Sequence, residues 1–393
     1  MPLGVSYMGT KRNLANDVAC VISRSRSGPL LDLFSGMCSV GEAVAPSRQV
    51  WNNDLQVFAY EVARSFFTSD GLPPNHLDMM TTCLPRITQK VQFLKDLFRF
   101  HYEKEVNSLS SGDLGALQEI ENAFPSEYTG EKYSLFAAKY SGSYIGCIQA
   151  VEVDAIRAVI DELLHEDRIS DQSHRWMLLA LCRSVSRCST STGHFAQPLK
   201  VKPSNLRKYI SQRRRSILKE WSSALQELLP VGSQHWRRRN YAFRGEAIGT
   251  LQSFSGRRKP AVIYADPPYT SDQYSRYYHI YETLILYDHP DVDGEGRYRA
   301  GRAVSGFSLK SSVLRSLLSL IENASNLGAD LVLSYPTNGL LPNSREALPE
   351  LLKRYYPYCE PPMEMQHSHS TMGGSKGAVR QTVTEVLYRA YFK

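Results

Sequence analysis

Near its N-terminus the chain reads Leu30-Leu31-Asp32-Leu33-Phe34-Ser35-Gly36-Met37-Cys38-Ser39-Val40-Gly41, and this stretch indicates the fold class. The short apolar run at its start is typical of a buried strand, and the glycine-containing turn leads into a helix that we expect from Glu42. A second strand, Gln49–Asp54, follows and ends in a carboxylate. Strand, glycine turn, helix, strand and acid in this order predict an α/β fold of the nucleotide-binding type.

Asp32, Phe34, Gly36 and Asp54 are the candidate binding residues of this first unit. A glycine after a buried strand lets the backbone approach a ligand closely at the carboxyl edge of a sheet. Asp54 ends the next strand, where a carboxylate can accept both hydroxyl hydrogens of a ribose. The glycine turn alone is also consistent with a plain strand–helix corner, but together with Asp54 it favours an adenosine-type cofactor.

The rest of the chain alternates between helical and strand patterns. From about residue 85 the pattern is mostly helical, and strand character returns after about residue 255. The expected elements are helices at 151–166, 175–185 and 208–229, a strand at 261–265, a helix at 278–287, a glycine-rich polar loop at 288–305, a helix at 311–326, a strand at 330–335, a loop at 366–376 and a strand at 382–392. We therefore expect one α/β domain, residues 1–85 and 256–393, interrupted by a helical, basic insertion at 86–255.

Asp266-Pro267-Pro268-Tyr269 follows the buried strand at 261–265 and is the most specific motif of the chain. The Asp266 carboxylate and the Pro267 carbonyl offer two acceptors for the two hydrogens of an amino group on an aromatic ring. Paired prolines fix the backbone so that the carbonyl points into the site. Tyr269 provides a face on which an extruded base can stack. The alternative interpretation is a strand that ends in an ordinary Pro-Pro turn.

Tyr7-Met8-Gly9-Thr10-Lys11-Arg12 combines an aromatic residue, a glycine and two cations near the start of the chain. Such a segment can close over a cofactor, with Lys11 facing a carboxylate. An exposed basic terminus is an equally good interpretation of these residues alone.

The positive charge of the chain is concentrated in one segment. The formal net charge is +7, while residues 200–259 hold 15 Lys and Arg against three acidic residues. Two arginine runs in this segment, Arg213-Arg214-Arg215 and Arg237-Arg238-Arg239, have aromatic residues nearby. Backbone contacts plus base stacking require this combination, so we predict that these six arginines contact nucleic acid. A solvated face is the alternative.

Several classes of protein are disfavoured by the composition. Neither an apolar run of eighteen residues nor a secretory leader is visible, which favours a cytoplasmic protein without a membrane span. The seven cysteines form no CxxC pair, so reduced thiols are expected rather than disulfides or zinc. His367-x-His369 lacks a neighbouring carboxylate or cysteine, and we therefore predict a polar loop and no metal site.

Taken in order, Tyr7–Arg12, Asp32–Gly41, Asn53-Asp54 and Asp266–Tyr269 resemble the Dam-like class of adenine-specific DNA methyltransferases. The resemblance implies a Rossmann-like S-adenosylmethionine-dependent methyltransferase fold with a large helical insertion that recognises the target. It also implies methyl transfer from S-adenosylmethionine to the 6-amino group of adenine in double-stranded DNA, after the base is flipped out. A cognate restriction or defence nuclease is the partner that this class suggests.

Carried over residue by residue, the resemblance implies that Tyr7 and Lys11 touch the cofactor. Phe34 and Gly36 then line the pocket for its methionine and adenosine, while Asp54 holds the ribose. Asp266 serves both cofactor and target amine, and Pro267, Pro268 and Tyr269 complete the base site. The run Phe34–Ser39 departs from the class because its usual second glycine is replaced, which affects the shape of the loop.

Other functions remain open at this point. Methylation of adenine in RNA, or of the 4-amino group of cytosine, requires a similar motif. A protein of another class, a non-catalytic cofactor-binding or DNA-binding partner in a restriction or defence assembly, is also compatible with the sequence.

Overall fold

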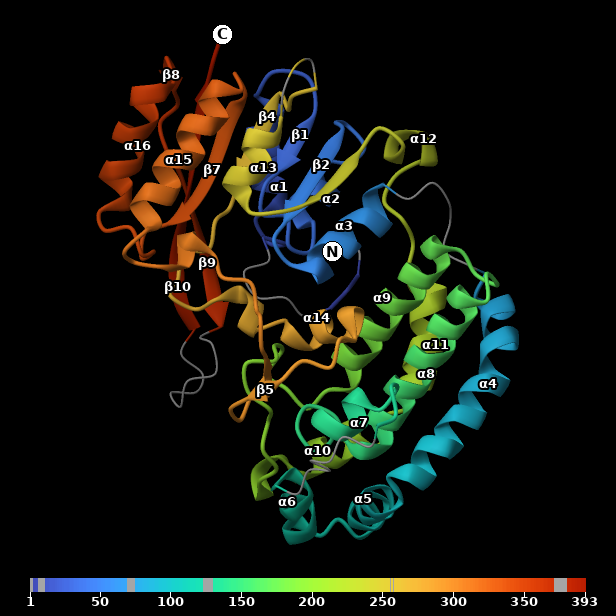
Figure 1. The fold of residues 1–393 in the computed structure, drawn as a ribbon. Coiled ribbons are helices and arrows are strands. Elements are labelled where there is room, and N and C mark those ends of the chain that lie inside the picture. Colours follow the sequence, from blue (N-terminus) through green and yellow to red (C-terminus); the bar gives the residue numbers. More distant parts are fainter. Residues whose placement is uncertain are drawn as a thin grey trace.

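A single eight-stranded sheet forms the centre of the molecule in the computed structural model (Figure 1). The structure describes residues 3–5, 11–68, 75–122, 130–254, 256, 258–370 and 380–393. The strand order is β3-β2-β1-β4-β7-β10-β8, and β9 pairs with β10. The strands are β1 (Leu30–Asp32), β2 (Val50–Asp54), β3 (Tyr241–Arg244), β4 (Val262–Ala265), β7 (Asp330–Pro336), β8 (Tyr358–Cys359), β9 (Met363–Ser370) and β10 (Arg380–Tyr391).

The direction of the strands fixes where a ligand can bind. The five strands from β3 to β7 are parallel, whereas β10 runs antiparallel to β7, β8 and β9. The order of the chain reverses between β1 and β4, which lie side by side. In open α/β sheets such a switch point leaves a crevice at the carboxyl ends of the strands. This mostly parallel sheet is consistent with the expected fold of an S-adenosylmethionine-dependent methyltransferase.

Both faces of the sheet are buried, which explains the continuous apolar runs of its central strands. Leu30 and Val262 belong to the core on one face, and Leu31 and Ile263 to the core on the other. The first face is covered by α1 (Ala15–Ser23), α2 (Ser39–Val44) and α3 (Val57–Phe67), and the second by α13 (Ala247–Ser253), α15 (Val313–Asn326) and α16 (Ser344–Tyr355).

A separate group of helices packs beside the sheet domain (Figure 1). It consists of α4 (His76–Leu97), α5 (Arg99–Ser111), α6 (Leu114–Asn122), α7 (Leu135–Lys139), α8 (Cys147–His165), α9 (Asp171–Cys188), α10 (Leu206–Arg213) and α11 (Ile217–Glu227). Phe66 of α3 meets Trp176 of α9 edge to face, with 4.7 Å between the ring centres. The core on this face of the sheet therefore continues into the helical group.

The contacts of the helices and strands lead us to propose ends for the insertion that differ from those expected at 86–255. Helix α4 begins at His76, ten residues earlier. At the other end, β3 pairs with β2 from Trp51↔Tyr241 to Asp54↔Arg244, and α13 packs on the sheet, so residues 241–253 belong to the sheet domain. We propose that the insertion comprises α4 to α11.

Two expected elements also differ in the structure. The single helix expected at 208–229 is two helices, because Ser216 accepts the N–H of Lys219 through its hydroxyl and begins α11 afresh. The loop expected at 366–376 is a strand as far as Ser370, where β9 pairs with β10; residues 371–376 lie outside the described part. Backbone pairing with a long neighbouring strand outweighs the polar composition of this segment.

Two small elements connect the sheet to the helical group. Helix α14 (His279–Leu286) follows β4 and contacts both α3 and α9. The polar segment expected at 288–305 contains a hairpin of β5 (Val292–Asp293) and β6 (Tyr298–Arg299). Among the described helices, including α12 (Gln234–Arg237), we find none with the length and hydropathy that a bilayer span requires.

Glu282 of α14 fixes the start of α3. Its two carboxylate oxygens accept the backbone N–H groups of Val57 and Phe58, each at 2.9 Å. Replacing Glu282 by Ala should lower the free energy of unfolding by about 1–2 kcal/mol, because two helix N-terminal donors lose their acceptor. Urea denaturation followed by circular dichroism measures this loss. Glu322→Ala, an exposed acid on α15, is the control and should change stability by less than about 0.5 kcal/mol. Equal stability of the two variants would contradict the assignment.

Candidate active site

A cavity of about 1010 Å³, counting its open mouth, lies at the carboxyl ends of the parallel strands. Its size is at the upper end of the range for ligand pockets. The turns after β1, β2, β3 and β4 all contribute to its wall, as the switch point of the sheet requires. The lining segments are residues 32–37, 53–56, 245–247, 266–268 and 273–275, with Lys11, Ser39, Val40, Tyr264, Ala303 and Ser305.

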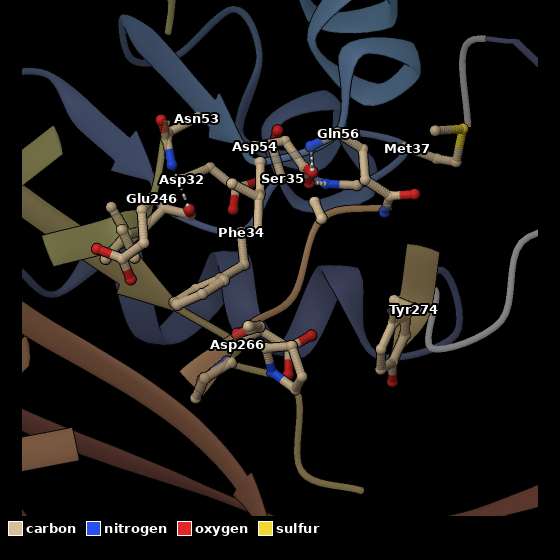
Figure 2. A pocket seen from close by; sticks show the side chains of 18 of the residues that line it. Asp32, Phe34, Ser35, Met37, Asn53, Asp54, Gln56, Glu246, Asp266 and Tyr274 are labelled. Atoms are coloured by element: carbon tan, nitrogen blue, oxygen red, sulfur yellow. Dashed lines mark hydrogen bonds between the residues drawn. The ribbon is translucent and has the colours of Figure 1, made fainter. Parts of the chain in front are cut away.

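Asp54 ends β2 and holds the first turn in place. One carboxylate oxygen accepts the N–H of Gly36 at 2.9 Å and the other accepts the N–H of Gln56 at 2.9 Å (Figure 2). Gly36 adopts a left-handed conformation with φ of 46°, which turns its N–H toward Asp54. Burial raises the pKa of Asp54 to about 6, although these two hydrogen bonds favour its charged form. Each oxygen keeps a further lone pair for a ligand hydroxyl.

Asp32 is a buried carboxylate with an unused acceptor. Its Oδ1 has no hydrogen-bond partner within the described residues. Burial raises its pKa well above the usual range, and the neighbouring carboxylates of Asp266 and Asp54 raise it further. An ammonium group of a ligand would supply both the missing hydrogen bond and a compensating charge. Beside it, Phe34 lines the cavity and meets Phe307 edge to face at 5.2 Å.

Cys38 occupies the position where the resemblance leads us to expect a second glycine. It retains the backbone conformation that glycine favours, with φ of 56° and ψ of 32°. Its side chain is fully buried, and its N–H donates to the carbonyl of Ser35. Burial raises the pKa of the thiol well above the usual range. The loop therefore keeps its left-handed turn without the second glycine.

Lys11 lies between two carboxylates at the floor of the cavity. Its Nζ is 2.9 Å from Oδ1 of Asp266 and 3.3 Å from Oε1 of Glu385 on β10. Lys11 and Glu385 are buried, and Ser334 donates its hydroxyl to the same Glu385 oxygen at 2.5 Å. Burial alone would lower the pKa of Lys11, but the carboxylates of Asp266 and Glu385 more than offset it and raise the pKa well above the usual range.

The residues after β4 divide between the cavity wall and its surroundings. Asp266, Pro267 and Pro268 line the cavity, whereas Tyr269 is not part of its described wall. Tyr269 instead lies near Lys11, whose Nζ is 5.8 Å from the ring centre. Tyr274, which hydrogen-bonds to Tyr269, is the aromatic residue of this segment that lines the cavity. Figure 2 shows Asp266 below Phe34 and Tyr274 to one side. Tyr274 is thus a second aromatic candidate for base stacking, and the role expected of Tyr269 stays a prediction.

Glu246 is a cavity residue that the sequence analysis missed. It follows β3, and its Oε2 accepts the N–H groups of Ile248 and Gly249 at the start of α13. Asn53 holds this turn by donating to the carbonyl of Gly245 at 3.2 Å. The signal for a strand was present, since Tyr241 and Phe243 alternate with smaller or polar residues before a glycine. The arginines around them obscured it.

Two of the six arginines expected to bind nucleic acid are buried. Arg213 is 1% exposed and donates to the carbonyl of Ser143 at 2.7 Å. Arg237 is 3% exposed and donates to the carbonyls of Val231 and Gly232. The predicted nucleic-acid contact is therefore wrong for these two residues, because their guanidiniums support loops inside the protein.

The other four arginines are exposed but belong to two different parts of the fold. Arg214 and Arg215 follow α10 in the helical group, where Arg214 donates to the carbonyl of Leu109 and Arg215 pairs with Glu220 at 2.6 Å. Arg238 and Arg239 follow α12, close to the edge strand β3 in the sequence. Tyr7, which was expected to touch a cofactor, lies outside the described residues.

Comparison with known proteins agrees with the resemblance seen in the motifs. Residues 131–300 match the family of D12 class N6 adenine-specific DNA methyltransferases. This matched region includes Asp266–Tyr269 and all of α8 to α11, but it begins after the Asp32 and Asp54 segments.

Curated relatives cover more of the chain at low identity. The chain is 23% identical to the modification methylase LlaI of Lactococcus lactis subsp. lactis, over 89% of the chain and 48% of that protein. It is 24% identical to the type II methyltransferase M.FokI of Planomicrobium okeanokoites, over 89% and 47%. It is also 24% identical to the type II methyltransferase M.NlaIII of Neisseria lactamica, over 90% and 89%. The chain thus spans about half the length of the first two relatives.

The contacts of Lys11 predict a large effect of removing Glu385. Glu385→Ala should lower the free energy of unfolding by about 3–5 kcal/mol, because a buried ammonium loses one of its two carboxylates. Glu364→Ala is the control, since Glu364 forms an exposed ion pair with Arg345 at 2.8 Å and should contribute at most about 1 kcal/mol. Guanidinium denaturation of both variants tests the difference. If Glu385→Ala were as stable as its control, the buried pair would not support the fold.

Proposed function

We propose that the chain transfers the methyl group of S-adenosylmethionine to the 6-amino group of adenine in double-stranded DNA, in keeping with its match to the D12 class of N6 adenine-specific DNA methyltransferases over residues 131–300. One observation carries the proposal. Asp32, Phe34, Gly36 and Asp54 line the same cavity as Asp266, at the switch point of one sheet. A cofactor half and an amine-binding half therefore meet in a single space.

The cavity residues fit the cofactor. S-adenosylmethionine supplies a methyl group on a positively charged sulfur. Asp54 has one free lone pair on each oxygen for the two ribose hydroxyls, and its position at the end of β2 suits that contact. The unpartnered Oδ1 of Asp32 suits the ammonium of the methionine end. Phe34 supplies an apolar surface between these two groups and Asp266 (Figure 2).

Asp266 and Pro267 suit the target amine. The carboxylate of Asp266 and the carbonyl of Pro267 can accept the two amino hydrogens of adenine, and this pairing directs the nitrogen lone pair away from the ring plane. Lys11, at 2.9 Å, holds the carboxylate in position. Tyr274 offers the extruded base an aromatic surface at the cavity wall. Orientation rather than strong base chemistry is what these residues provide.

The names of the relatives support a place in restriction–modification. The three relatives described above are named modification methylase or type II methyltransferase. We accordingly propose a cognate nuclease as the functional partner and assign recognition of the DNA target to the helical insertion, α4 to α11.

Replacing Asp266 tests the chemistry directly. Asp266→Ala should reduce tritium transfer from labelled S-adenosylmethionine to duplex DNA by at least about 100-fold, because one of the two amine acceptors is lost, while DNA binding persists. Asp17→Ala, an exposed acid on α1, is the control and should transfer normally. Mass spectrometry of the nucleosides identifies the product: 4-methylcytosine, or transfer to RNA alone, would contradict the proposal. Near-normal turnover of Asp266→Ala would remove this residue from the site.

The raised pKa of Asp54 predicts how cofactor binding depends on pH. Below its pKa of about 6 the carboxyl binds a proton and loses an acceptor for the ribose. The affinity for S-adenosylmethionine should therefore fall by about tenfold for each pH unit below 6. Isothermal titration calorimetry between pH 5 and 8 measures it. Asp54→Asn should bind more weakly at pH 8 and lose this part of the pH dependence, leaving only what Asp32 contributes. An unchanged pH profile in Asp54→Asn would rule out Asp54 as the titrating group.

A further inference from the structure

A second groove lies directly beside the candidate active site. It contains about 700 Å³ of empty space between the β5–β6 hairpin and the turn that follows the Asp266–Pro268 segment. Gln273 and Ser275 line both this groove and the main cavity. The two spaces therefore share a rim, and the groove lies beside a nucleotide whose base enters the cavity.

The shared rim is held by two hydrogen bonds. The N–H of Ser305 donates to Oε1 of Gln273 at 2.9 Å, and the hydroxyl of Ser275 donates to the carbonyl of Ala303 at 2.7 Å. Along this segment Ala303 and Ser305 line the cavity, while Arg302 and Val304 line the groove. Because these residues alternate, the short segment 302–305 lines both the main cavity and the groove.

Two guanidiniums gather around one tyrosine at this groove. Arg302 and Arg276 lie over the ring of Tyr298, at 4.8 and 5.0 Å from its centre. Nε of Arg276 also donates to the Tyr298 hydroxyl at 2.7 Å. The ring of Tyr298 orients both guanidiniums, but Arg276 also pairs with Asp272 at 3.8 Å, so Arg302 is the cation that lines the groove.

Arg302 is a cation without a carboxylate partner. It is half-buried and donates to the carbonyl of Arg299 at 3.2 Å, but no acidic group of the described chain lies within ion-pair distance of it. The neighbouring Arg299, by contrast, pairs with Asp288 at 2.6 Å. The guanidinium donors of Arg302 are therefore available to an external anion.

The acidic residues of the groove set the direction of such an anion. Asp291 and Asp293 are exposed and line the groove from the first strand of the hairpin and the residues before it. Their carboxylates repel an anion from that side. A phosphate is thereby directed toward Arg302 and Tyr298, on the side of the main cavity.

We propose that this groove binds the DNA backbone next to the extruded adenine, with Arg302 contacting phosphate and Tyr298 holding the Arg302 side chain in place. The proposal rests on the proposed function. It assigns the positioning of the flipped nucleotide to the hairpin after β4, a segment outside the arginine runs of residues 200–259. Phosphate contacts on this rim would fix the register of the strand, while Asp266 and Pro267 select the amine.

The salt dependence of DNA binding tests the phosphate contacts. In a plot of log Kd against log salt for a fluorescent duplex, Arg302→Gln should reduce the slope by about 0.9, because one phosphate contact is lost. Arg302→Lys keeps the charge and should retain the slope. Arg354→Gln, an exposed arginine on α16 at the other end of the sheet, should also leave it unchanged. A slope in folded Arg302→Gln that equals the slope of the control would overturn the proposal.

Neutral methylphosphonates locate the phosphate. Replacing single phosphates on either side of the methylated adenine should weaken binding of the unmodified protein at one position and leave Arg302→Gln unaffected there. Equal losses in both proteins at every position would contradict the assignment. Both readouts are binding measurements. If Arg302→Gln reduces the slope but the unaltered protein transfers no methyl group, the proposed function fails and the phosphate contact stands. If the unaltered protein transfers methyl groups but Arg302→Gln leaves the slope unchanged, the phosphate contact fails and the proposed function stands.

Discussion

The buried ammonium of Lys11 is the interaction on which the candidate site depends. It comes from the N-terminal segment and contacts Asp266 after β4 and Glu385 on β10, two carboxylates from distant parts of the chain. Both carboxylates lie within 3.3 Å of its Nζ, so the ammonium attracts them from opposite parts of the sequence. With Lys11 beside it, Asp266 keeps its place at the floor of a cavity whose wall also includes Asp32 and Asp54. The position of Asp266 thus depends on a strand near the end of the sequence.

The cavity residues on β1, β2 and β4 were predictable from sequence for a physical reason. Strands buried on both faces leave uninterrupted apolar runs, so Leu30–Asp32 and Val262–Ala265 could be located without a structure. Parallel neighbours end at the same edge of a sheet, so residues that follow such runs meet in space. Asp32, Asp54 and Asp266 are therefore brought together by topology.

Side-chain direction and burial could not be predicted in this way. Arg213 and Arg214 are adjacent in sequence, yet one is buried against loop carbonyls and the other is exposed, since helix packing decides which side of α10 meets the protein. Tyr269 and Tyr274 are both aromatic and follow the same strand. The conformation of the turn, which the composition does not reveal, places Tyr274 on the cavity wall. Strand β3 was hidden because its charged neighbours resembled a solvated surface, whereas its pairing with β2 is a tertiary contact.

The left-handed conformation of Cys38 limits which residues this position can accept. A side chain with a Cβ costs roughly 1–2 kcal/mol in that backbone conformation. Glycine would relieve the strain but leave unfilled the space of a fully buried thiol, and anything larger than cysteine would collide with a core that has no room to yield. Position 38 should consequently accept very few neutral replacements.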